Sequence, residues 1–320
     1  MKAFEYVSAQ TPQSATDLAG KDGRFIAGGI DILGQIKDAI VEPKRLVNVK
    51  SLPNSREIKP GAQAWTIGTN VTVAELAAHA ELRKIFAGLA EAAAEVGSPQ
   101  IRNVATLGGN LAQHSRCWYY RHRDVRCLKE GGSTCYAREG ENKYHALFSG
   151  NPCISPTPSN LAIALSALEA TAHVQRAGKL VKMTMAELYD KAWSNPLAHH
   201  SLETADLIVH VEIPVRQTRS AYLQMAEKHD FDWALVSCSA AARVEGKKLT
   251  GARLVLGQVA PVPYRSDEAD KFLEGKDLDD AVATKAAELL LAAATPFQYN
   301  AYKVPLAHAL IRRTLQKLVS

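Results

Sequence analysis

Short apolar runs alternate with amphipathic stretches along the N-terminal part of the chain, a pattern typical of strands and helices packed against one another. Strand-like runs occur at residues 4–7, 24–27 and 46–49. Ser14 can cap a short helix that ends before Gly20. A second helix is expected after Asp31, because isoleucines recur there at helical spacing. We therefore expect alternating strands and helices up to about residue 50.

The middle of the chain is predicted to be mixed, with one long irregular segment. The expected elements are a hairpin around Pro60-Gly61, Ala-rich helices at 72–80 and 82–95, a helix at 161–168, a hairpin at 171–183 and a strand at 207–213. Residues 101–160 are rich in glycine, cysteine, arginine and aromatic residues and show little periodicity. A long irregular segment inside a compact protein is usually functional, so we expect a site there.

Near residue 215 the pattern changes from alternating elements to strands followed by helices. Strands are expected at 221–225, 234–244 and 249–256, and helices at 266–273, 279–293 and 302–319. Such an order indicates an α+β domain. We therefore divide the chain into a domain of residues 1–215, with subdomains of about 1–55 and 56–215, and a smaller α+β domain of residues 216–320.

Four of the five cysteines are crowded into the irregular segment, within a loop of residues 112–155. They are Cys117, Cys127, Cys135 and Cys153, whereas Cys238 lies in an apolar run and is expected to be a buried, inert thiol. Their spacing lacks both the C-x2-C knuckle of common zinc sites and the short ferredoxin run. Three interpretations stay open: a 4Fe–4S cluster, a tetrahedral zinc ion, or unligated and redox-active thiols.

Three histidines near these cysteines could replace one of them as a metal ligand. They are His114, His122 and His145. For each, a surface position or an ordinary hydrogen bond is the favoured interpretation.

Two glycine pairs could hold a phosphate group. The first lies in the run 27–34, between a predicted strand and a predicted helix, and the second lies in the run 106–111, just before the cysteines. Paired glycines let backbone N–H groups approach a pyrophosphate closely. The first run is no Walker loop, because Gln35-Ile36 replaces Lys-Ser/Thr, and it is not G-x-G-x-x-G either. A phosphate-bearing cofactor and a plain turn both remain possible at this point.

Composition narrows the class of protein. Hydrophobic residues make up 47% of the 320 residues and charged residues 22%, which excludes a disordered chain, a coiled coil and a collagen-like chain. The net charge of +5 does not separate nucleic-acid binders from enzymes. The sequence has no transmembrane run and no apolar core of a signal peptide near its start. We therefore expect no membrane insertion and a cytoplasmic location, or a periplasmic one if a partner carries the export signal.

The two glycine runs, AGGIDIL and ATLGGNL, resemble the flavin-contacting loops of the FAD-binding medium subunit of the molybdenum hydroxylases, the xanthine dehydrogenase family. The segment RCWYYRHRDVRCLKEGGSTC, with the later Cys153, resembles an inserted loop of some members, including 4-hydroxybenzoyl-CoA reductase and periplasmic aldehyde oxidoreductase. In those members the loop carries an extra 4Fe–4S cluster. The resemblance implies an α+β fold, with a two-part FAD-binding domain of the vanillyl-alcohol-oxidase/PCMH type and a smaller α+β C-terminal domain.

The resemblance also implies which residues hold the cofactors. For FAD they are Ala27, Gly28, Gly29, Ile30, Asp31, Ile32, Leu33, Thr106, Gly109, Asn110, Asn160, Leu207 and Lys228. For the 4Fe–4S cluster they are Cys117, Cys127, Cys135 and Cys153. Asn160 departs from the family pattern, which has Asp at this place, and Lys228 falls where the family approaches the isoalloxazine ring.

The implied function is that of an oxidoreductase subunit without a catalytic residue of its own. The substrate would be transformed on a large molybdopterin-binding partner, and electrons would pass through the 2Fe–2S clusters of a small partner to this FAD. The external acceptor or donor could be NAD, a quinone, a ferredoxin or oxygen. The alternatives are a stand-alone flavin oxidoreductase, disfavoured because no His or Tyr base lies beside the glycine runs, and a zinc-stabilised nucleic-acid-binding module, suggested by the basic and aromatic loop.

Overall fold

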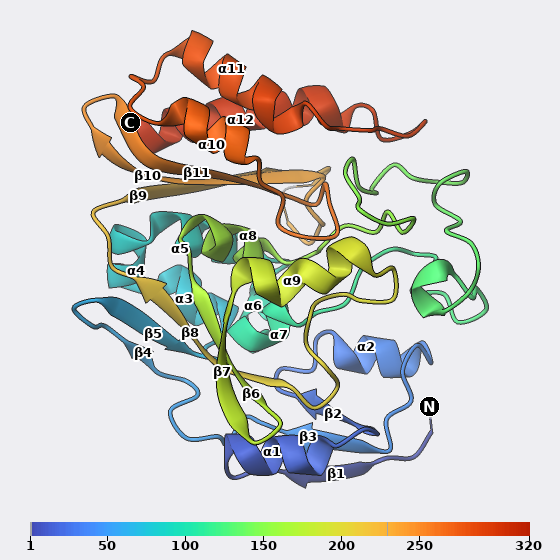
Figure 1. Cartoon of the computed structure of the whole chain (residues 1–320). Helices are drawn as coiled ribbons and strands as arrows, with labels where there is room; N and C mark the ends of the chain where they lie inside the picture. The colour runs from blue at the N-terminus through green and yellow to red at the C-terminus, as the bar shows by residue number, and fades with distance from the viewer. Residues whose placement is uncertain (1, 229) are drawn as a thin grey trace.

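Three sheets follow one another through the molecule, each accompanied by helices (Figure 1). The structure is a computed structural model that describes residues 2–228 and 230–320. The N-terminal sheet lies at one end of the view and the C-terminal helices lie at the other. An irregular segment, green in Figure 1, projects beside them.

The N-terminal sheet is parallel, and two helices connect its strands. In spatial order it contains β1 (Glu5–Ser8), β3 (Arg45–Asn48) and β2 (Gly23–Ile26), with α1 (Pro12–Ala19) after β1 and α2 (Ile32–Lys37) after β2. The expected strands and helices of this part are confirmed. The predicted cap of the first helix is wrong, because Thr11 accepts the N–H of Ser14 at 3.0 Å and Pro12 occupies the first turn. A proline at that position is pre-organised for a helix, so α1 begins earlier than expected.

The second sheet is antiparallel and contributes to an extensive hydrophobic core. Its order is β4 (Ile58–Lys59), β5 (Ala64–Gly68), β8 (Leu207–Pro214), β6 (Thr171–Arg176) and β7 (Lys179–Thr184). The core includes buried residues of this sheet and of α3 (Val73–Ala78), α5 (Ala87–Ala94) and α8 (Asn160–Ala167). Alternate residues such as Ile67, Val211 and Ile213 point into that core, which leaves polar residues such as His210 and Glu212 on the other face of the sheet.

The Ala-rich stretch at 82–95 is not the single helix that its pattern predicts. It forms the end of α4 (Ala80–Ile85) and then α5, with a break at Phe86, whose φ and ψ are −124° and 54°. The Phe86 ring is buried and meets Trp65 edge-on, with ring centroids 5.9 Å apart. Burial of this aromatic pair outweighs the local preference for a continuous helix.

The segment between residues 112 and 159 is irregular, as expected, apart from a single 3-10 turn at Leu128–Glu130. Residues 101–111 were also expected to be irregular, and this part of the prediction is wrong, because they form most of two short helices, α6 (Pro99–Val104) and α7 (Leu107–Leu111). One helix was not predicted, α9 (Met185–Ser194), which follows β7 directly. A capping box between Thr184 and Glu187 starts this helix, and that S/T-x-x-E signal was present in the sequence.

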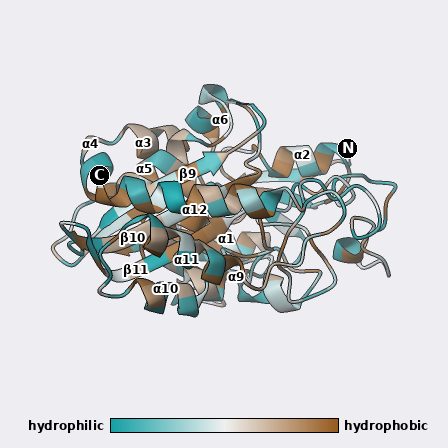
Figure 2. Cartoon of the chain, turned by 90° about the horizontal axis from the view of Figure 1, so that it is seen from above, coloured by the Kyte–Doolittle hydropathy of each residue, from teal (hydrophilic) through white to brown (hydrophobic). Residues whose placement is uncertain are grey.

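The C-terminal part is α+β, as predicted. An antiparallel sheet of β11 (Lys248–Gly257), β10 (Val236–Glu245) and β9 (Arg219–Met225) is covered by α10 (Asp267–Leu273), α11 (Asp280–Leu291) and α12 (Lys303–Val319). Figure 2 shows hydrophobic and hydrophilic residues side by side along α12, and Leu310, Ile311 and Leu315 are on its buried face. Among the described residues, no helix is both long and apolar enough to cross a membrane.

Candidate functional site

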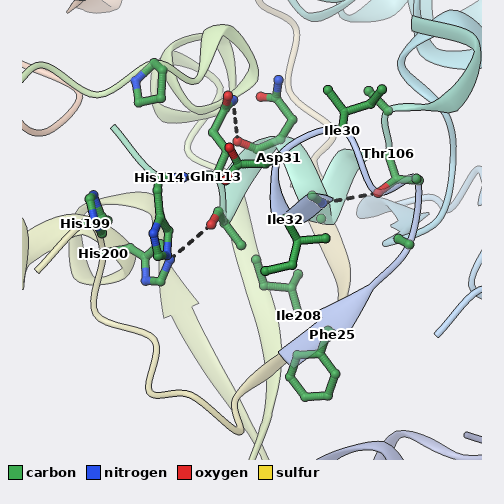
Figure 3. A pocket seen from close by; sticks show the side chains of 18 of the residues that line it. Phe25, Ile30, Asp31, Ile32, Thr106, Gln113, His114, His199, His200 and Ile208 are labelled. Atoms are coloured by element: carbon green, nitrogen blue, oxygen red, sulfur yellow. Dashed lines mark hydrogen bonds between the residues drawn. The ribbon is translucent and has the colours of Figure 1, made fainter. Parts of the chain in front are cut away.

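The main cavity has a volume of about 630 Å³ and is lined by segments that are far apart in the sequence. They are the end of β2 with the start of α2, the α7 region, residues 195–208, and residues 231–234. Figure 3 shows His114, His199 and His200 together on one side of this cavity, with Ile30 and Thr106 on the other. The volume is within the range of small-molecule and cofactor sites.

The first glycine run brings backbone N–H groups to the cavity wall. A Cβ atom on Gly28 would lie 1.9 Å from the carbonyl oxygen of Val104, so only glycine fits where this loop passes α6. Gly29 has a φ of +77°, a value that L side chains rarely adopt. Within the described part of the chain, the N–H groups of residues 28–32 donate to no protein acceptor. Such donors need an outside partner, and a phosphate oxygen is a suitable one.

The second glycine run forms the start of α7 and packs closely against the five-stranded sheet. Thr106 caps the helix by accepting the N–H of Gly109 at 3.2 Å. A Cβ on Gly108 would lie 1.9 Å from the side-chain oxygen of Thr69, which fixes a glycine there. The side-chain oxygen of Asn110 accepts a hydrogen bond from Ser159 at 2.7 Å, which orients its amide.

The cavity brings together most residues that the resemblance assigned to FAD. Its lining includes Ala27, Gly28, Gly29, Ile30, Asp31, Ile32, Thr106, Gly109, Asn110, Asn160 and Leu207. It includes neither Leu33, which contacts Gly29, nor Lys228, which is exposed after β9. The amide of Asn160 is engaged by protein groups, Gln224 at 3.0 Å and Gln258 at 3.3 Å.

Asp31 ties the first glycine run to the start of the cysteine loop. Its carboxylate accepts hydrogen bonds from Arg116 at 2.5 Å, from Arg121 at 2.7 Å and from Gln35 at 2.8 Å. It also accepts the backbone N–H of His114 at 2.9 Å. Burial alone would raise the pKa of Asp31, but the two arginines outweigh burial and hold this pKa below its ordinary value. The ionised carboxylate therefore links the first glycine run to the cysteine loop.

His114, His199 and His200 line the cavity, although none of them was predicted for a cofactor site and His114 was a candidate only as a metal ligand. The rings of His114 and His199 stack with centroids 4.0 Å apart, although the residues come from distant segments. Burial lowers the pKa of His114 to about 3 and also lowers the pKa of His200, so both rings are neutral. His114 bonds to Tyr120 rather than to a cysteine, at 2.8 Å from Nδ1 to the hydroxyl. No sequence spacing could have paired His114 with His199.

Several buried polar atoms of the lining have no hydrogen-bond partner among residues 2–228 and 230–320. They are Oε1 of Gln35, Oδ1 of Asn70 and Nδ1 of His200. Orphaned buried polar atoms are costly unless a water or a ligand satisfies them. At the cavity mouth, the guanidinium of Arg116 lies 4.8 Å from the centre of the half-exposed Trp233 ring. The lining thus combines unsatisfied polar atoms with an aromatic rim, as a polar and aromatic cofactor requires.

The four clustered cysteines surround a second, smaller cavity. Its lining includes Cys117, Cys127, Cys135 and Cys153, together with Lys129, Tyr120, His145 and Ser155. All four cysteines are free thiols, and Cys238 is buried elsewhere, as expected. Nε2 of His145 lies 3.1 Å from the sulfur of Cys117, and the remaining candidate, His122, is on the surface.

Lys129 places a buried positive charge among these sulfurs. Its ammonium donates to the carbonyl oxygen of Ala198 at 2.8 Å, and only 7% of the residue is exposed. Burial lowers the pKa of Lys129, while the four cysteines act in the opposite direction. The pKa of Cys153 is lowered by a hydrogen bond from Cys135 and by Lys129, against the effect of burial. Burial raises the pKa of Cys117 to about 12, so this thiol needs a bound metal to ionise.

One aromatic side chain of the cysteine cavity contacts residues that line the main cavity. Tyr120 lines the cysteine cavity, and its hydroxyl bonds to His114, which lines the main cavity. Its ring also meets His199 at 4.8 Å between centroids. The two sites are therefore joined by packed rings, and Lys129 adds a second link through Ala198.

Two family patterns match the chain almost end to end. The FAD binding domain in molybdopterin dehydrogenase matches residues 2–216, and the CO dehydrogenase flavoprotein C-terminal domain matches residues 220–318. The chain is 32% identical to the aldehyde oxidoreductase FAD-binding subunit PaoB of Escherichia coli K12, over 100% of this chain and 98% of that protein. It is 22% identical to the carbon monoxide dehydrogenase medium chain of Hydrogenophaga pseudoflava, over 98% of this chain and 96% of that protein.

Solved structures share the fold over its full length. Quinoline 2-oxidoreductase from Pseudomonas putida 86 matches with a TM-score of 0.77 and 23% identity, over 100% of this chain and 98% of that chain. The Cu,Mo-CO dehydrogenase matches with a TM-score of 0.78 and 21% identity, over 99% of this chain and 98% of that chain. These findings confirm the expected fold class, a FAD-binding domain followed by a C-terminal domain. The chain belongs to the family of FAD-binding medium subunits of the molybdenum hydroxylases.

Proposed function

We propose that this chain is the electron-transfer subunit of a heteromeric molybdenum hydroxylase, with FAD in the main cavity and a 4Fe–4S cluster on the four cysteines. Its partners would be a large molybdopterin-binding subunit and a small 2Fe–2S subunit, since the relatives are named as medium chains and FAD-binding subunits. The flavin and the cluster would exchange electrons with those partners and with an external acceptor or donor, such as NAD, a quinone, a ferredoxin or oxygen.

The fit of FAD rests on the main cavity. The unpaired N–H groups of residues 28–32 suit a pyrophosphate, and Thr106, Gly109 and Asn110 lie at the same cavity. The free acceptors of Gln35 and Asn70 can accept hydrogen bonds from a sugar or a ring. The chain's task in this site is to bind and orient the cofactor, and burial keeps the rings of His114 and His200 in the lining neutral.

The fit of a 4Fe–4S cluster rests on the donor set and its spacing. Four thiols face one small cavity that also holds the ammonium of Lys129. Four sulfurs on a single zinc ion, at about 2.3 Å each, lie about 3.8 Å apart. Within the described part of the chain, no three of these sulfurs lie within 4.8 Å of one another. Cys135 and Cys153 also share a hydrogen bond, so the choice of a multinuclear core rests on four thiols that line one cavity, and Lys129 would offset part of the negative charge of that core.

Substitution of one cysteine tests this assignment. The Cys135→Ser variant of the purified complex should lose about four irons and the acid-labile sulfide per chain and keep its FAD, because the two cofactors use different loops. Cys238→Ser is the matched control, since this thiol is buried in the C-terminal core, and it should keep both cofactors. Iron and sulfide that survive in Cys135→Ser, or a wild type with zinc and no sulfide, would overturn the cluster. A wild type without FAD would overturn the flavin assignment.

A further inference from the structure

A cluster of two histidines and a glutamate lies on the face of the five-stranded sheet that points away from the core. His173 is on β6, and His210 and Glu212 are on the neighbouring strand β8. Antiparallel pairing places His210 directly opposite His173, and the two-residue spacing places Glu212 on the same face. One side-chain ligand atom from each residue lies within 4.8 Å of the others. None of the three lines the main cavity or the cysteine cavity.

The ring of His173 directs one nitrogen at the carboxylate of Glu212. This buried Nε2 atom lies 2.7 Å from Oε2 of Glu212. The two imidazole rings stack with centroids 4.1 Å apart. A buried imidazole nitrogen that faces a carboxylate, beside a second imidazole, has the donor character of a metal ligand.

We propose that His173, His210 and Glu212 form a binding site for a divalent transition-metal ion of the zinc type. Two imidazoles and a carboxylate are a donor set that zinc takes in proteins. Ligand atoms about 2.1 Å from one ion at a tetrahedral angle lie about 3.4 Å apart. The observed group is already within 4.8 Å, so small rotations of side chains suffice. The ion would link β6 to β8, two strands that are not consecutive in the sequence. Water would complete its coordination sphere.

Lys182 competes for the same carboxylate. It stands opposite His173 on β7, and its ammonium is 3.5 Å from Oε2 of Glu212. The Lys182 side chain is 70% exposed, so it can swing into solvent when an ion binds. An ion pair between Lys182, Glu212 and a protonated His173 is the competing explanation of the cluster, and it predicts no metal binding.

Zinc uptake by the intact complex separates the two explanations. The complex, with its other cofactors in place, is dialysed against buffered micromolar free zinc and its bound metal is counted by mass spectrometry. We expect one additional zinc per chain in the wild type and none in His210→Ala or Glu212→Gln. His308→Ala is the matched control, because this histidine lies on α12 outside the cluster, and it should bind as the wild type does. Lys182→Ala should bind zinc about fivefold more tightly, since an exposed ion pair of this kind is weak.

Two results would overturn the proposal. One is a wild type that takes up no additional zinc. The other is an uptake that is the same in His210→Ala and Glu212→Gln, which would place the ion elsewhere, for example on the cysteines. Retained FAD absorbance in both variants shows that they are folded.

Discussion

Removing the buried ion pair between Asp31 and Arg121 should lower the free energy of unfolding far more than removing an exposed ion pair. The side chains of Asp31 and Arg121 are each only 15% exposed, and their charged atoms are 2.7 Å apart. Removing one partner of a buried pair leaves the other charge buried and unpaired, which costs about 3–5 kcal/mol. We expect this cost for Asp31→Asn, which leaves Arg116 and Arg121 unpaired, and a smaller cost for Arg121→Gln, because Arg116 still pairs with Asp31. In the double variant Arg116 stays unpaired but Arg121 no longer adds an unpaired charge, so the loss should be smaller than the sum of the two single losses.

A double-mutant cycle measures this coupling directly. The free energy of unfolding is determined by urea titration for the wild type, Asp31→Asn, Arg121→Gln and the double variant, and a coupling of about 2 kcal/mol or more is expected. Glu5 and Arg45 supply the matched control, since their charged atoms are 2.6 Å apart but their side chains are 54% and 37% exposed. Such an exposed pair should show only about 0.2–1 kcal/mol.

The cycle also distinguishes two roles of Asp31: linking the glycine run to the cysteine loop, and contacting the cofactor. If Asp31 acts only by touching the cofactor, Asp31→Asn will reduce flavin content equally with and without Arg121, and the coupling will be near zero. A coupling no larger than that of the Glu5–Arg45 pair would refute the assignment of Asp31 as the link between the glycine run and the cysteine loop.

Three further outcomes are expected. Gly28→Ala should lose most of its FAD, because the new Cβ would lie 1.9 Å from the carbonyl oxygen of Val104; full flavin content in the purified variant would contradict this. Lys129→Met should lower the reduction potential of the proposed cluster by on the order of 100 mV, because a buried positive charge favours the reduced form; an EPR-monitored redox titration that shows no shift would contradict it. Burial lowers the pKa of His114 to about 3 and that of His199 well below its ordinary value. Unfolded histidines take up protons near pH 6.5, so the stability that these residues contribute is complete above that pH and is lost as the pH falls toward the folded values. For His114 this loss is about 3–5 kcal/mol. Urea unfolding between pH 7.5 and 4 should show it, with a shallower slope in His114→Gln.

Local patterns in the sequence were sufficient to predict most of the helices and strands. The first glycine run lies where β2 meets α2, as its pattern predicts, and the strands and helices of the C-terminal part appear in the predicted order. The errors have local physical causes: Pro12 moved the start of α1, and the buried ring of Phe86 broke a predicted helix. A short stretch of sequence does not reveal which residue Phe86 contacts in the fold, or that its ring is buried.

The candidate site was predictable only in part, because its walls come from distant segments. The glycines and the four cysteines were identifiable from residue type and spacing. The stacking of His114 on His199 and the burial of Lys129 among the cysteines depend on segments that meet only in the folded chain. Lys228 was assigned by resemblance alone, and the structure places it outside the lining of the main cavity.

A crystallographic map of the purified complex, recorded with anomalous data at the iron edge, tests the central claim most directly. We expect diphosphate density against the N–H groups of residues 28–32 and a strong iron signal between the four clustered cysteines. Solvent alone in the main cavity, together with a single-ion signal that appears at the zinc edge and not at the iron edge, would contradict the account.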